Sequence, residues 1–131
     1  MKINITSGDM LNEILQCKYP AETFVPFREA MIKGSYDSKL FSDEFIEERS
    51  KIHGVSAQEY LEKLGVFVDI LKSAKKYEEI VLWFGEEPFC AENVKVVIQS
   101  LRESGFDGKL VYNVVDENDG NVLRTTTVSL A

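Results

Sequence analysis

The stretch EEIVLWF at residues 78–84 is apolar at every position from Ile80 to Phe84, with no polar residue in alternation. A strand with one face in water alternates apolar and polar residues, whereas an unbroken apolar run is typical of a strand covered on both faces. Helices provide such cover in layered α/β proteins, in which most strands run parallel. This run therefore predicts a central strand of an α/β domain.

Further strand patterns lie on both sides of this run. MKINIT (1–6) alternates apolar and polar residues, and KLVYNVV (109–115) is rich in residues that favour strands. TFVPF (23–27) predicts only a short extended segment, because Pro26 lacks the N–H group that a central strand needs. Residues 30–41 are expected to form a loop or a partial helix.

Start and stop signals predict the helices. Asp9 is placed to cap a helix after the first strand, and SDEFIEERSKIHG (42–54) begins with a capping serine and ends at a glycine. Ser56 and Glu59 have the spacing of a capping box, in which each side chain bonds the backbone N–H of the other residue. A helix over 88–105 begins with a proline in its first turn and closes at a glycine.

The order of these elements predicts the fold class. Asp119-Gly120 is typical of a hairpin turn, after which NVLRTTTVSL (121–130) is expected to return antiparallel. The chain has 131 residues, enough for one hydrophobic core. We therefore expect residues 1–131 to form a single layered α/β domain, with a mostly parallel sheet flanked by helices and a C-terminal antiparallel hairpin.

Charge and hydropathy argue against several classes of partner. The chain carries 22 acidic and 15 basic residues, a net charge of −7. Nucleic acid binding depends on Lys and Arg that neutralise phosphates, so we expect no nucleic acid partner. No apolar run approaches the roughly 20 residues of a membrane span, and MKINITSGD lacks the apolar centre of a signal peptide, so we expect a cytoplasmic protein without a membrane partner.

Cys17 and Cys90 are too few for a disulfide framework or a zinc site.

Polar residues follow three of the predicted strands at the points where those strands end. In an open parallel sheet, ligands bind outside the carboxyl ends of the strands, where loops and helix N-termini converge. A small polar ligand is therefore expected at this edge of the sheet. The candidate ligand-binding residues are Ser7, Gly8, Asp9, Arg28, Glu29, Glu86 and Glu87.

Simpler roles compete with ligand binding at these positions. Asp9 is often only a helix cap, and Glu86 and Glu87 are favoured beside the positive end of a helix dipole by about 0.3–1 kcal/mol each. Arg28 is equally well explained as the ion-pair partner of a neighbouring acid. Acidic residues outnumber the basic residue in this group. We therefore expect an occupied site to contain either a divalent cation or a protonated carboxyl. The divalent cation is the one candidate cofactor.

Nucleophilic catalysis by a Cys–His pair is disfavoured. Cys90 falls in the first turn of the predicted 88–105 helix, where the dipole lowers a thiol pKa but the preceding glutamates raise it. His53 is the only histidine and ends a different helix, so we expect it at the surface. Cys90 is therefore predicted to be an inert buried thiol. Trp83 and Phe89 are most simply core residues, although either could form a pocket wall.

Several ordered blocks of the sequence resemble the DUF1835 family, a group of bacterial domains of unknown function. The blocks cover about residues 1–115 and read INITSGDMLNEIL, FVPFREAMIKG, LFSDEFIEERSKIHGVSAQEYLEKL and IVLWFGEEPFCAENV. Members are often longer, with a further C-terminal domain, so the resemblance implies that this chain corresponds to the N-terminal part of a longer protein. The family itself implies no activity.

The resemblance also singles out polar positions. The most recognisable polar residues of the family would fall on Gly8-Asp9, on Arg28-Glu29 and on Glu86-Glu87. Many relatives have a His-Asp or Glu-Asp type pair after the Leu-Trp-Phe run, whereas this chain has Glu86-Glu87. Any role that needs a histidine at that point is therefore not expected here.

Three functions remain open. In the first, Asp9 and the glutamate pair hold a divalent cation or act as acid and base while Arg28 binds an anionic group, which suits a metal-bridged phosphate, a nucleotide or a polar amine. In the second, the same residues recognise a ligand without turnover, which the lack of a phosphate loop favours. In the third, an acidic helix such as DEFIEER (43–49) binds a basic protein, although such faces are usually only solvated.

Overall fold

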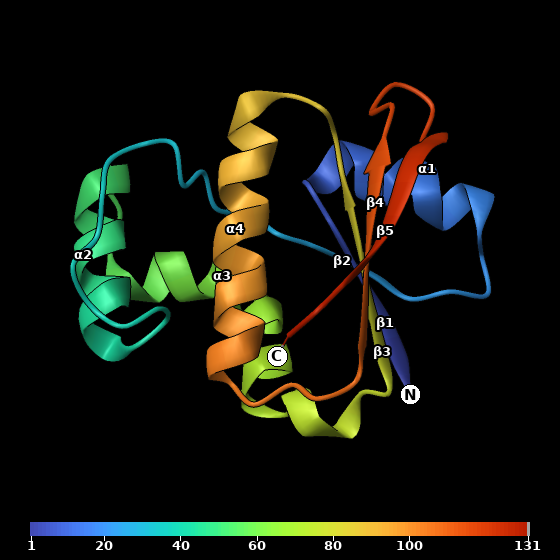
Figure 1. The fold of residues 1–131 in the computed structure, drawn as a ribbon. Helices are drawn as coiled ribbons and strands as arrows, with labels where there is room; N and C mark the ends of the chain where they lie inside the picture. Colours follow the sequence, from blue (N-terminus) through green and yellow to red (C-terminus); the bar gives the residue numbers. More distant parts are fainter. Residues whose placement is uncertain (131) are drawn as a thin grey trace.

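The computed structural model describes residues 1–130 and contains one five-stranded sheet (Figure 1). The strand order is β2-β1-β3-β4-β5, with the first four strands parallel and the last antiparallel. The strands are β1 (Lys2–Thr6), β2 (Phe24–Pro26), β3 (Glu79–Phe84), β4 (Lys109–Val115) and β5 (Val122–Val128). The predicted fold class is confirmed: an α/β layered domain with a mostly parallel sheet and a C-terminal antiparallel hairpin.

Helices cover the sheet on both faces (Figure 1). Helix α1 lies on one face, while α3 and α4 lie on the other and α2 packs outside them against α3. Their bounds are α1 (Asp9–Lys18), α2 (Asp43–His53), α3 (Ala57–Lys72), α4 (Pro88–Glu103) and a short 3-10 helix η1 (Ala74–Lys76). Within residues 1–130, no helix combines the length and apolar character needed to cross a membrane.

The central strand β3 packs against a hydrophobic core on each face of the sheet, which explains its unbroken apolar run. Ile80, Leu82 and Phe84 are fully buried in the main core, which β1 and β4 share with α3 and α4. Trp83, of opposite orientation, packs against the smaller core on the α1 face. Its indole Nε1 donates to Asn4 Oδ1 at 2.9 Å, so the polar end of this half-buried ring is satisfied.

Most of the predicted helix signals act as expected. The Ser42 side chain accepts from the backbone N–H of Phe45, and Gly54 ends α2 in the left-handed conformation. Ser56 and Glu59 form the reciprocal capping box at the start of α3. The N-termini of α2 and α3 and the C-terminus of α2 are therefore set by local hydrogen bonds and backbone conformation.

The prediction that Asp9 caps α1 is wrong. Gly8 is the N-cap and has no side chain to offer, while Asp9 is the first helical residue. The Asp9 carboxylate instead bonds Arg28, because β2 runs parallel to β1 and its carboxyl end lies beside the start of α1.

Candidate functional site

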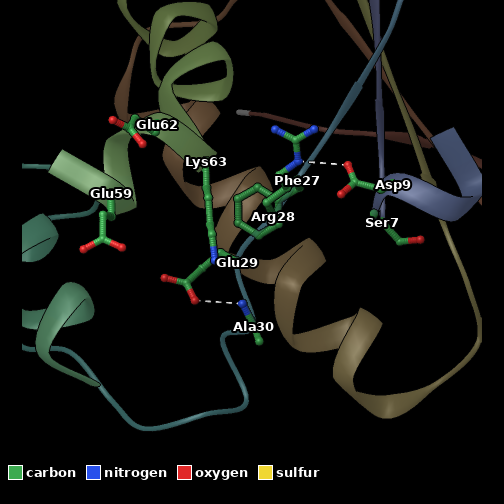
Figure 2. A pocket seen from close by; sticks show the side chains of 10 residues that line it. Ser7, Asp9, Phe27, Arg28, Glu29, Ala30, Glu59, Glu62 and Lys63 are labelled. Atoms are coloured by element: carbon green, nitrogen blue, oxygen red, sulfur yellow. Dashed lines mark hydrogen bonds and ion pairs between the residues drawn. The ribbon is translucent and has the colours of Figure 1, made fainter. Parts of the chain in front are cut away.

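A cavity of about 560 Å³ lies at the carboxyl ends of β1 and β2 (Figure 2). We call it the edge cavity. The structure brings five of the seven predicted residues to it, namely Ser7, Gly8, Asp9, Arg28 and Glu29. The remaining lining residues are Phe27, Ala30, Glu59, Glu62 and Lys63.

Arg28 is held in place at one side of the edge cavity. Its Nε donates to Asp9 Oδ1 at 2.8 Å, and both side chains are partly exposed. Among residues 1–130, the terminal Nη atoms of Arg28 make no hydrogen bond, so the donor end of the guanidinium is free for another group. Lys63 contributes a second cation from α3. The uncapped first turn of α1 adds backbone N–H groups and the positive end of a helix dipole.

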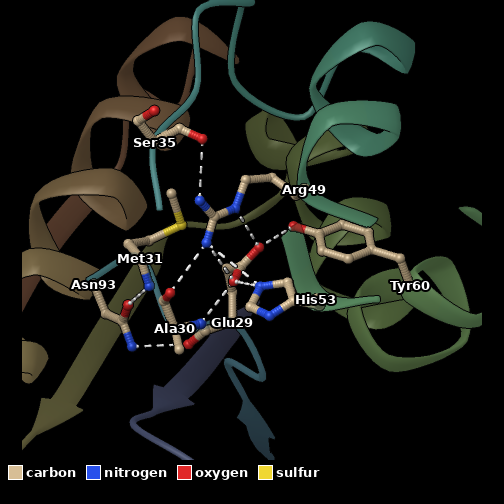
Figure 3. Close-up of polar contacts among 8 residues, drawn as sticks. All are labelled: Glu29, Ala30, Met31, Ser35, Arg49, His53, Tyr60 and Asn93. Carbon is tan, nitrogen blue, oxygen red and sulfur yellow. Dashed lines mark hydrogen bonds and ion pairs between the residues drawn. The ribbon is translucent and has the colours of Figure 1, made fainter. Parts of the chain in front are cut away.

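Glu29 borders the edge cavity, but its carboxylate is committed elsewhere (Figure 3). The side chain is fully buried and belongs to a group with Arg49, His53 and Tyr60 that we call the buried ion-pair cluster. Arg49 donates to both carboxylate oxygens, with Nε to Oε2 at 3.1 Å and Nη2 to Oε1 at 3.0 Å. Tyr60 Oη donates to Oε2 and His53 Nε2 lies on Oε1, both at 2.5 Å.

Within the buried ion-pair cluster, the surroundings of Glu29 and Tyr60 set the protonation of these two groups. Burial alone would raise the pKa of Glu29, but hydrogen bonds from Arg49, from Tyr60 and from the backbone N–H of Ala30 outweigh it and hold this pKa below its ordinary value. Burial, together with the bond to the Glu29 carboxylate, raises the pKa of Tyr60. The cluster therefore contains an ionised glutamate and a neutral tyrosine.

The same cluster ties the loop after β2 to α2 and α3, and Asn93 adds a link to α4. Arg49 also donates to the carbonyls of Ser35 and Ala30, and Asn93 of α4 pairs with the backbone of Glu29 and of Met31. Among residues 1–130, no buried side-chain nitrogen or oxygen lacks a hydrogen-bond partner. This loop is therefore ordered by polar contacts rather than by regular secondary structure.

Sequence reasoning missed Arg49 and misplaced His53. The expected surface position of His53 is wrong: its side chain is 22% exposed and bonds Glu29. Phe45, Arg49 and His53 recur at a spacing of four, so they share one face of α2 with a buried phenylalanine. An arginine on an apolar stripe is the signal that could have revealed the cluster.

The structure does not bring Glu86 and Glu87 into the edge cavity. Glu86 Oε1 pairs with Arg124 Nη1 of β5 at 3.3 Å on the surface. Glu87 is the N-cap of α4, and its side chain makes no capping bond. Both residues lie at the carboxyl edge of the sheet, but the predicted cluster of acids is divided between separate places.

A different glutamate lies at the point where the strand order reverses. Because β1 connects outward to β2 across one face and the chain returns to β3 across the other, this switch point falls between β1 and β3. Glu117, from the turn between β4 and β5, accepts hydrogen bonds there from Ser7 Oγ at 2.5 Å and from Cys90 Sγ at 3.6 Å. A Cβ on Gly85 would lie 2.2 Å from Glu117 Oε1, so the carboxylate rests directly on the glycine.

Cys90 is the buried thiol that the sequence predicts. Burial, reinforced by the negative charge of Glu117, raises the pKa of Cys90 to about 11. A thiol in this state is a weak nucleophile at neutral pH. The chemistry available at the switch point is therefore hydrogen bonding rather than covalent attack.

Metal coordination has no preformed ligand group in the described part of the chain. Across residues 1–130, no three His, Cys, Asp or Glu side chains are grouped so as to hold a metal ion. Comparison with known proteins gave no match to a family model, to a curated protein or to a solved structure.

Proposed function

We propose that this domain binds a small polar molecule in the edge cavity and recognises it through an anionic group such as a phosphate. The observation that supports this most directly is the state of Arg28, whose Nε is fixed by Asp9 while its Nη atoms have no partner among residues 1–130. A guanidinium held in this way is oriented for bidentate recognition of a phosphate or carboxylate.

The surroundings of Arg28 fit the same kind of ligand. Lys63 and the first turn of α1 place further positive charge at the edge cavity. Glu59 and Glu62 line it as well, and their carboxylates suit ligand hydroxyl or amino groups. The volume of about 560 Å³ falls within the range of small-molecule sites.

Binding without turnover is the simplest form of this function, as in a ligand-sensing module. A phosphate bridged to the protein by a divalent cation is the variant in which Asp9 would act as a metal ligand instead of pairing with Arg28. On the sequence blocks alone, we also propose that the chain belongs to the DUF1835 family; a cytoplasmic location stays a prediction from the sequence.

Two arginines offer a matched test. Arg28 and Arg124 are both exposed and each pairs with one carboxylate, but only Arg28 borders the edge cavity. Exposed ion pairs contribute about 0–1 kcal/mol, so Arg28→Ala and Arg124→Ala should both melt within a few degrees of the wild type.

The readout is the rise in melting temperature with inorganic phosphate or adenosine 5′-monophosphate, each with and without Mg²⁺. Ligand at about 100 times its Kd stabilises by about 2.7 kcal/mol. We expect this gain in the wild type and in Arg124→Ala and its loss in Arg28→Ala. Equal gains in both variants would refute the site, and a gain that requires Mg²⁺ would favour the metal-bridged variant.

A further inference from the structure

A second cavity of about 240 Å³ adjoins the edge cavity. The two cavities share Arg28, Ala30 and Lys63, and the smaller one is also lined by His53 and Tyr60. We call it the histidine cavity. Because Arg28 and Lys63 border both cavities, an anionic group held by these cations lies next to the space that His53 faces.

Glu29 determines which nitrogen of His53 carries the hydrogen. The carboxylate oxygen Oε1 lies 2.5 Å from His53 Nε2, and Glu29 is ionised, so Nε2 must be the donor. Among residues 1–130, Nδ1 of this ring has no hydrogen bond. The ring is inclined by 22° to that of Tyr60, with centroids 6.3 Å apart.

Satisfying Glu29 does not require the histidine. Its carboxylate already accepts hydrogen bonds from Arg49, Tyr60 and the backbone of Ala30. His53 is partly exposed, unlike the fully buried Glu29 and Arg49, and it lines the histidine cavity with Tyr60, Arg28 and Lys63. The arrangement matches a carboxylate that orients an imidazole and stabilises its protonated form.

We propose that Glu29 and His53 form an acid–base pair for the ligand of the edge cavity, with His53 Nδ1 as the atom that takes up the proton. This inference rests on the proposed function and adds a proton-accepting residue to it. A hydroxyl, a water or an ammonium group next to the bound anionic group would give its proton to Nδ1 and keep the electron pair of the broken bond, while Nε2 keeps its own proton and Glu29 balances the new charge. Glu29 acts only through His53, so it is a positioning residue.

Charged groups of both signs surround His53. Glu29 contacts its ring, Arg49 lies beside it within the cluster, and Arg28 and Lys63 line the same cavity. An anion bound by Arg28 and Lys63 would offset the positive charge of these cations. Anion binding and protonation of His53 should therefore strengthen each other.

Sulfate tests this coupling because it stays a dianion at every pH used. We expect the wild type to bind sulfate roughly three- to tenfold more tightly at about pH 5.5 than at about pH 8, because a protonated imidazole beside the cavity would attract the dianion. In His53→Asn, binding at the higher pH should be retained while this pH dependence is lost. Carboxylates that titrate at the acidic end do so in both proteins, so the difference between them isolates His53.

Nuclear magnetic resonance of the wild type keeps the test decisive if the variant does not fold. His53 is the only histidine, so its ring signals are unambiguous. At high pH we expect the tautomer with the hydrogen on Nε2, and addition of sulfate should shift the Nδ1 signal. The other tautomer would overturn the acid–base pair.

The remaining outcomes separate this inference from the proposed function. If sulfate or phosphate stabilises the wild type but leaves the His53 signals and the pH dependence unchanged, the acid–base pair is refuted and the edge cavity stands. If neither anion binds the wild type at either pH, the proposed function fails and this inference fails with it.

Discussion

Arg49 is fully buried, yet its charge is matched closely enough for the fold to tolerate it. Two hydrogen bonds to Glu29 and two to backbone carbonyls take up four of the five N–H donors of the guanidinium. Removing a charge from water costs several kcal/mol, and good geometry offsets this only when every donor and acceptor is paired. The pair is therefore better understood as fixing where α2 and the loop after β2 sit than as a large net source of stability.

A double-mutant cycle measures this pairing. Glu29→Gln should lower the free energy of unfolding by about 3–5 kcal/mol, because it leaves the Arg49 charge buried without a counter-ion. Adding Arg49→Met should recover part of the loss, with a coupling of about 1–3 kcal/mol. Urea unfolding of both single variants and the double variant gives the values, and additive losses would show that the two side chains do not interact.

Acid should weaken the fold through Glu29. Its pKa is lower in the folded chain than the ordinary value of 4.5, so the folded state binds this proton less readily than the unfolded chain. The stability it provides is fully present above the unfolded pKa and is lost as pH falls through the folded pKa. Unfolding free energies from neutral to acidic pH should fall more steeply for the wild type than for Glu29→Gln, and parallel curves would contradict this.

The helices illustrate what a local pattern determines. The capping serines, the left-handed Gly54 and Pro88 at the start of α4 act within one or two turns, so the sequence was sufficient to place them. Asp9 has the same local signal for capping but bonds Arg28, because a distant charge competes with the backbone of its own helix. Local signals fail where a partner from another element competes with them.

Three glycines, two in loops and one in a helix, should respond differently to alanine. A Cβ on Gly108 would lie 2.5 Å from the backbone oxygen of Glu78, which cannot move without disturbing the start of β3, so about 1–3 kcal/mol should be lost. At Gly85 the obstacle is the flexible Glu117 side chain, so the loss should be about the 0.5–1.5 kcal/mol of a hydrogen bond.

Gly65 in α3 is the control, because a Cβ there meets nothing within 4 Å. Gly65→Ala should raise stability by roughly 0.5–1 kcal/mol, since alanine favours the helix. Chemical denaturation ranks the three variants. A loss for Gly85→Ala that persists in the Glu117→Ala background would show that the contact with Glu117 is not its cause.

The whole molecule should open from the hairpin edge inward. Strand β3 is paired on both sides and its main-core residues are fully buried, whereas β5 is the edge strand and is exposed along nearly its full length. Amides of β3 should therefore exchange with solvent only through global unfolding, and those of β5 through local opening at lower free energy. Hydrogen exchange resolved by residue checks this, and equal protection of both strands would contradict it.

At this scale, the layers and the mostly parallel sheet of the domain follow from repeating patterns, but the strand order within the sheet and the site do not. The apolar run of β3 required helices on both faces, and parallel strands placed Ser7, Asp9 and Arg28 at one edge. The side-chain partners at that edge come from segments far apart in sequence, such as Ser7 with Glu117. Such pairs depend on the angles and distances at which separate elements pack. The spacing of residues along one segment does not determine these.

Glu117 has one further consequence for recognition. The protein supplies its own carboxylate at the place where this kind of sheet most readily accepts a ligand, and that carboxylate already uses the hydroxyl of Ser7. An incoming molecule therefore meets the Glu117 side chain between β1 and β3, whereas the edge cavity gives it access to Arg28. Because Glu117 fills the crevice between β1 and β3, a ligand is directed along the carboxyl edge of the sheet, towards β2 and α3.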